Sequence, residues 1–104
     1  MPKNQKDEVN KLFKAILTLK TQEECAAFFD DVCTIQEIEA IAQRFEVACQ
    51  LSDGKSYIDI NKNTGASTAT ICRVRKCLNY GDGGYATAIE RLIEGYYECL
   101  TKVF

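Results

Sequence analysis

Residues 56–78 have the sequence SYIDINKNTGASTATICRVRKCL, and the architecture of the chain follows from this segment. Its apolar residues recur every three or four positions on both sides of Gly65, which predicts two short helices joined by a turn. Ser56 and Ser67 stand where a hydroxyl can cap the start of each helix. Gly65 suits a left-handed turn, and Ala66 is small enough for a close helix crossing. The segment therefore has the pattern of a helix-turn-helix.

Positive charge is concentrated on this motif. Residues 54–80 contain five cations and one carboxylate, a net charge of +4, whereas the remaining residues carry −6 and the whole chain −2. Phosphate contact needs such a local cluster, because distant surface charge is screened over about 10 Å at physiological salt. The alternative is a helical hairpin that only contributes to a core. The motif favours DNA binding, with these groove-facing residues in its second helix: Thr68, Ala69, Thr70, Cys72 and Arg73.

Helical periodicity and cap signals predict four more helices and no strand, so the expected fold is a single all-α domain over residues 1–104 with six helices. The first helix is expected over Gln5–Lys20. Capping boxes at Thr21–Glu24 and Thr34–Glu37 open the next two, and the last runs from Tyr85 to Val103. The side chains expected inside are Cys25, Phe28, Phe29 and Val32 in the second helix, Ile38, Ile41, Ala42, Phe45, Ala48 and Cys49 in the third, and Ile89, Leu92, Ile93, Tyr96, Tyr97 and Leu100 in the last.

The first and last helices carry wider apolar faces than so small a chain can cover. We expect these faces to pack against a second subunit, although a compact monomer with a large aromatic core is the alternative.

The composition excludes several classes of protein. The chain has no histidine, which excludes catalysis by a His general base or a Ser-His-Asp triad and excludes His-containing metal sites. Its six cysteines form no Cys-x-x-Cys pair, so we expect reduced, partly buried thiols and no bound metal. The N-terminus has no apolar signal-peptide core, and no apolar run is long enough to cross a membrane. A cytoplasmic, non-enzymatic protein without membrane partners is expected.

Several segments resemble the Trp repressor superfamily, and most closely its YerC/YecD-type branch. They are Phe28–Thr34 (FFDDVCT), Ala42–Ala48 (AQRFEVA), Gly65–Arg73 (GASTATICR) and Arg73–Gly81 (RVRKCLNYG). The resemblance covers about residues 5–100 in collinear order. It implies an intertwined homodimer in which the first three helices and the last build the dimer core. The helix-turn-helix units would then project as two heads that bind double-stranded DNA.

By position, the resemblance places further DNA contacts at Tyr57, Ile58 and Asn61 in the first helix of the motif. Tryptophan-responsive members have longer polar or basic residues there, so we do not expect the same operator. Ser67 begins the second helix of the motif, and Arg75 and Lys76 look like added phosphate contacts. For Arg75 and Lys76 the alternative is an ordinary solvated side chain.

The resemblance also implies a site for a small-molecule corepressor. Arg44 and Arg73 match two arginines that flank the ligand of tryptophan-responsive members, and Thr34 matches a pocket threonine. A guanidinium can hold a carboxylate and stack on an aromatic plane. However, Val74 replaces a glycine beside the ligand and Cys77 replaces a serine that holds its amino group. These departures argue against L-tryptophan, and leave an ion pair for Arg44 and a phosphate contact for Arg73 as the simpler interpretations.

The sequence therefore favours a homodimeric transcriptional regulator, of the repressor type, that binds DNA through residues 56–78. Two alternatives remain: a dimeric protein-interaction module without DNA binding, and a tryptophan-responsive repressor.

Overall fold

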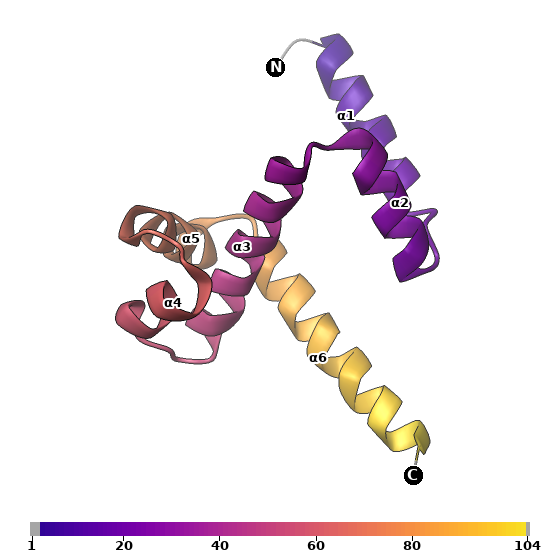
Figure 1. Cartoon of the computed structure of the whole chain (residues 1–104). Coiled ribbons are helices and arrows are strands. Elements are labelled where there is room, and N and C mark those ends of the chain that lie inside the picture. Colours follow the sequence, from indigo (N-terminus) through magenta and orange to yellow (C-terminus); the bar gives the residue numbers. More distant parts are fainter. Residues whose placement is uncertain (1–2, 104) are drawn as a thin grey trace. The chain divides into compact units, whose positions relative to one another are not determined.

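The computed structural model describes residues 3–103, with side chains described over residues 5–95. This part of the chain is all-α (Figure 1). Its six helices are α1 (Lys3–Ile16), α2 (Gln22–Val32), α3 (Ile35–Ser52), α4 (Tyr57–Thr64), α5 (Thr68–Tyr80) and α6 (Gly84–Val103). The chain forms two compact units, and the boundary between them falls within α3, after Ile38. None of the described helices has the length and apolar composition needed to span a membrane.

The first unit contains α1, α2 and the start of α3. Helix α1 ends at Ile16 rather than at Lys20, because the chain tightens there into a turn. Backbone hydrogen bonds join Thr18 to Ala15 and Leu19 to Ile16, and the Thr18 hydroxyl also donates to the Ala15 carbonyl at 2.6 Å. Leu17, which follows the last residue of α1, is 84% exposed.

The two predicted capping boxes open α2 and α3. The Glu24 and Glu37 amides donate to the hydroxyls of Thr21 and Thr34, each at 3.1 Å. The Glu37 carboxylate in turn accepts from the Thr34 amide at 2.8 Å, which completes a reciprocal box. In α2 the carboxylate of Glu24 accepts instead from the amide one residue earlier, that of Lys20.

The single chain does not bury the apolar face of α2. Phe28 and Phe29 are half-buried and make an edge-to-face contact with ring centroids 5.4 Å apart. Cys25 is also half-buried, whereas Val32 is 56% exposed, so the expected burial of α2 is wrong for the isolated chain. The reason is that within the first unit these side chains meet too few partners to be covered.

The second unit has a small, continuous core. Helix α3 contributes Val47, Ala48 and Leu51 to it, while Ile41 and Ala42 are exposed. The predicted stripe on α3 was therefore partly wrong: Ala48 belongs to the buried face, but this face is turned toward α4 and α5. In Figure 1 these two short helices lie beside the C-terminal half of α3. The core is completed by Ile60, Ala66, Ile71, Val74 and Ile89, with Phe45, Cys49, Tyr57, Leu78 and Tyr85 packed against it.

Helix α6 follows a glycine loop, as predicted, but it begins at Gly84, one residue before the predicted Tyr85. Ile89 packs into the core, but the expectation that Leu92 and Ile93 lie inside is wrong for the single chain, where they are 60% and 50% exposed. The remaining predicted positions on this face, Tyr96, Tyr97 and Leu100, lie outside the described side chains.

Candidate nucleic-acid interface

The first helix of the motif, α4, begins at a side-chain cap. Ser56 has an extended backbone, and its hydroxyl accepts a hydrogen bond from the Asp59 amide at 3.1 Å. One turn inside the helix, Ile60 is completely buried and anchors α4 on the core. Tyr57 is half-buried against the same core, while Ile58 between them is 81% exposed.

The turn after α4 has the left-handed backbone that its glycine predicts. Gly65 has φ 75°, a conformation that residues with a Cβ adopt only at a cost, and its amide donates to the Asn61 carbonyl at 2.8 Å. Ala66 is almost completely buried, which confirms that a small residue occupies the crossing.

Three polar side chains hold this turn in place. The Thr64 hydroxyl donates to the Ile60 carbonyl at 2.7 Å and accepts from the Ala66 amide at 3.1 Å. The Asn61 side-chain amide donates to the Ala66 carbonyl at 2.7 Å. From α3, the Gln43 side-chain amide donates to the Thr64 carbonyl at 3.1 Å. The turn is therefore fastened both to α4 and to α3.

The second helix of the motif, α5, presents a mixed face. The Ser67 hydroxyl accepts from the Thr70 amide at 3.2 Å and donates to the Thr70 hydroxyl at 3.1 Å, which caps the helix. Ile71 and Val74 are buried, so the opposite side faces outward. The structure exposes these predicted DNA contacts on α5 and its cap: Ser67, Thr68, Ala69, Cys72, Arg73, Arg75 and Lys76. Thr70 is half-buried beside them, and the predicted contact Asn61 is exposed on α4.

The cations of the motif are almost free of carboxylate partners. Lys55 lies 4.0 Å from the Asp53 carboxylate, and this is the only ion pair among the side chains that the structure describes. Both partners are at least half exposed, so the contact is weak. Lys62, Arg73, Arg75 and Lys76 are exposed without such a partner in the described part of the chain.

The hydrogen bond by which Gln43 holds the turn of this motif was not predicted from the sequence. Gln43 lies 21 residues before its partner Thr64, and a glutamine within an amphipathic helix carries no local signal of a distant acceptor. Asn61 was predicted as a DNA contact, but the structure shows its side-chain amide bonded within the motif. Both roles became visible only through the fold.

The predicted corepressor residues fall in different places. Thr34 caps α3 in the first unit. Arg44 on α3 and Arg73 and Cys77 on α5 are exposed in the second unit. Val74 is only 2% exposed and packs in the core, so its side chain is not offered to a ligand at the surface. The predicted alternative for Arg44, an ion pair with Glu37 or Glu46, is not formed among the described side chains.

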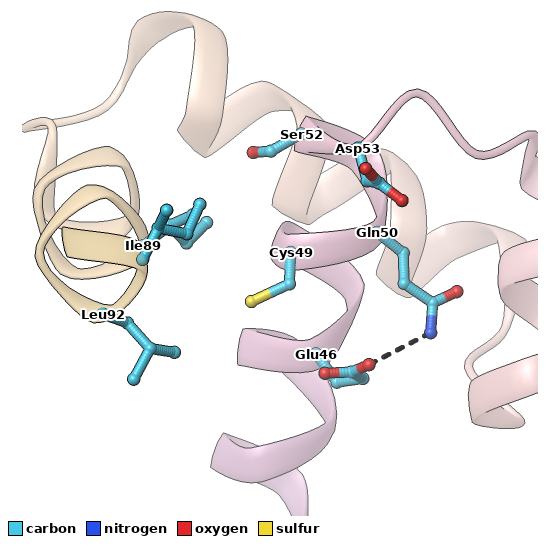
Figure 2. Close-up of a pocket in the computed structure, with 8 residues that line it drawn as sticks. Glu46, Cys49, Gln50, Ser52, Asp53, Ile89 and Leu92 are labelled. Carbon is cyan, nitrogen blue, oxygen red and sulfur yellow. Dashed lines mark hydrogen bonds between the residues drawn. The ribbon is translucent and has the colours of Figure 1, made fainter. Parts of the chain in front are cut away.

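Several hollows in the second unit are lined by side chains that the structure describes. One of about 330 Å³ separates α3 from α6 and is lined by Cys49, Glu46, Ile89 and Leu92, among others (Figure 2). A second of about 390 Å³ is lined by the glycine loop with Phe45, Cys77, Tyr85 and Ala88. The third, also about 330 Å³, lies on the motif beside Arg73, Lys76 and Tyr80.

The first hollow offers little reactive chemistry. Burial, helped by the negative charge of Glu46, raises the pKa of the Cys49 thiol above its ordinary value of 9.0. The thiol therefore stays protonated at neutral pH and is a poor nucleophile. Glu46 itself accepts a hydrogen bond from the Gln50 side chain at 3.2 Å (Figure 2). Nowhere in the described range do three potential metal ligands come together.

Known proteins share both the sequence and the fold. Protein YerC of Bacillus subtilis, which is uncharacterized, is 53% identical over 95 residues, covering 91% of each chain. The crystal structure of a TrpR-like protein from Eubacterium eligens matches with a TM-score of 0.80 and 55% identity, over 83% of this chain and 89% of that chain. A candidate Trp repressor from Staphylococcus aureus matches with a TM-score of 0.80 and 41% identity, over 88% and 95%.

The predicted resemblance is thereby confirmed, including the six-helix architecture. The family described as Trp repressor protein matches residues 7–93, which is most of the chain. The chain therefore belongs to the Trp repressor family, whose members are regulators and not enzymes.

Proposed function

We propose that this protein is a cytoplasmic transcriptional repressor that binds double-stranded DNA through residues 56–78. The observation that carries the proposal is the outer face of α5, where Arg73, Arg75 and Lys76 are exposed without carboxylate partners among the described residues. Such cations can neutralise phosphates and release counterions, while the N-terminal half of the second helix enters the major groove. Family membership supports the same proposal.

We further propose that the protein acts as a homodimer. Both ends of the chain leave large apolar side chains exposed, among them Phe13, Leu17 and Val32 at the N-terminal end and Leu92 and Ile93 on α6. A second copy that covers these side chains would remove them from water. Two-fold symmetry then predicts a palindromic operator, with the recognition helices about 34 Å apart, one turn of DNA.

The DNA-binding proposal is tested by fluorescence anisotropy with a random-sequence duplex over a range of salt concentrations. Wild-type affinity should fall steeply with salt, because each neutralised phosphate adds about 0.9 to the logarithmic slope. The double variant Arg73→Ala/Arg75→Ala should bind more weakly and lower the slope by about one for each lost contact.

The matched control is Lys14→Ala/Lys20→Ala, which removes the same charge from exposed positions of the first unit. This control should bind DNA nearly as wild type does. If the wild-type protein bound no duplex at low salt, the proposal would fail and the alternative of a protein-interaction module would replace it.

We also propose that L-tryptophan is not the effector. Cys77 lacks the hydroxyl that would hold the amino group of the ligand. Thermal unfolding with and without millimolar L-tryptophan should give the same Tm, because only a ligand that binds the native state raises it. A rise of several degrees would show that Arg44 and Arg73 form an amino-acid site.

A further inference from the structure

The outer face of the helix-turn-helix carries few groups that hydrogen-bond to bases. In DNA-binding proteins, direct recognition relies on arginine, lysine, asparagine or glutamine placed against base edges. Asp59 and Arg73 are exposed charged residues near the starts of the two helices, and the other exposed positions there are Ile58 on α4 and Thr68, Ala69 and Cys72 on α5. None of these four side chains is a guanidinium, an ammonium or an amide.

Polar groups close to these positions are already engaged. The Asn61 amide donates to the Ala66 carbonyl at 2.7 Å. The hydroxyls of Ser67 and Thr70 bond to each other at 3.1 Å in the cap of α5. Beside the Thr68 hydroxyl, this face therefore presents methyl groups on Ile58, Thr68 and Ala69.

Ile58 is the most unusual member of this set. It is 81% exposed in the first turn of α4, where its neighbour Ile60 already supplies the anchor to the core. An exposed isoleucine gains nothing from phosphate contact, since apolar surface is stabilised only by apolar surface. The cations Lys62, Arg73, Arg75 and Lys76 are available on the same motif to hold the phosphates.

The major groove offers one apolar group, the C5-methyl of thymine. We infer that this motif recognises thymine methyl groups, with Ile58 as the principal contact at the edge of the groove and Ala69 and Thr68 as further contacts. The inference rests on the proposed DNA binding and adds the chemistry by which a site is chosen. It predicts that the preferred duplex has thymines at defined positions of each half-site.

The experiment replaces thymine by deoxyuridine, which removes only the methyl group and keeps every hydrogen-bonding atom. The probe is the best-retained duplex from a random-sequence pool selected on the wild-type protein. Each thymine is replaced in turn, and binding is measured for the wild-type protein and Ile58→Ala. At a contacted thymine, the wild-type affinity should fall about threefold to fourfold for each methyl removed.

Ile58→Ala should bind the thymine duplex more weakly than wild type and should lose most of this discrimination at the position that Ile58 contacts. The control Lys62→Ala should weaken binding to both duplexes alike and leave their ratio unchanged, since it removes charge and not apolar surface. Because Ile58 is exposed, the variant should keep the wild-type circular dichroism spectrum and oligomeric mass.

Three results would overturn the inference. Equal affinity for thymine and deoxyuridine duplexes at every position would show that no methyl is recognised. Undiminished discrimination in Ile58→Ala would remove Ile58 from the contact. A change of oligomeric mass in Ile58→Ala would place this side chain between subunits. Failure to select or bind any duplex is a separate outcome, because it would overturn the proposed DNA binding itself.

Discussion

The side-chain amide of Asn61 joins α4 to the turn that orients α5. Its 2.7 Å hydrogen bond to the Ala66 carbonyl satisfies a backbone group next to the buried Ala66 side chain. We therefore interpret Asn61 as a residue that positions the recognition helix, although the family resemblance placed a DNA contact there. On this interpretation, the loss of Asn61 would change the shape of the motif and would not remove a contact with DNA.

Replacement of Asn61 by alanine should lower the free energy of unfolding by about 1 kcal/mol, the usual net value of one hydrogen bond in a protein. Urea unfolding followed by circular dichroism measures this change. The control is Asn63→Ala, which removes a longer bond, 3.2 Å to Gln50, on the exposed surface and should change stability by about 0.5 kcal/mol or less. A variant Asn61→Ala of unchanged stability but altered sequence preference would instead establish a base contact.

At the scale of single elements, the start of α3 depends on a reciprocal capping box. Two hydrogen bonds join Thr34 and Glu37, and the one that the Thr34 amide donates to the carboxylate is the main cause that lowers the pKa of Glu37 below its ordinary value of 4.5. The folded state thus holds the Glu37 proton less tightly than the unfolded state does. The stabilisation is complete above the ordinary pKa and is lost as the pH falls through the lowered value.

The variant Glu37→Gln should keep the cap, because glutamine can also accept from the Thr34 amide. It should, however, flatten the loss of stability that wild type shows as the pH falls below the ordinary Glu37 pKa of 4.5. The measurement is Tm as a function of pH, with Glu39→Gln as the control, since Glu39 is an exposed neighbour on the same helix. Parallel curves for wild type and Glu37→Gln would contradict the assigned cause of the pKa shift.

At the scale of the whole molecule, the distribution of exposed apolar side chains is uneven. The second unit buries a complete core around α3, α4 and α5, whereas the apolar faces of α1, α2 and α6 are largely uncovered in the single chain. Isolated amphipathic helices gain most of their stability from packing, so these faces need a partner. In the proposed homodimer, a second copy of the chain would cover these faces.

Wild-type protein should therefore have twice the chain mass of 11.7 kDa in light scattering at micromolar concentration. The variant Leu92→Glu should shift the mass toward that of one chain, because a carboxylate would be buried in the interface. The control Ile58→Glu makes the same chemical change at a position that is also exposed and should leave the dimer intact. A wild-type mass near 11.7 kDa would refute the dimer.

The local signals in the sequence were sufficient to predict the six helices and most of their ends. The caps at Thr21, Thr34, Ser56 and Ser67 act within three residues, and the left-handed turn at Gly65 needs only a missing Cβ. The apolar positions that recur on both sides of Gly65 include Ile60, Ile71 and Val74, and all three are buried.

The buried face of α3 and the hydrogen bond of Gln43 could not be predicted from the sequence, because both depend on tertiary packing. Which face of α3 is buried, Val47 and Leu51 rather than Ile41, depends on where α4 and α5 lie, and periodicity cannot choose between two apolar faces of one helix. The hydrogen bond from Gln43 to Thr64 joins residues that only the fold brings together.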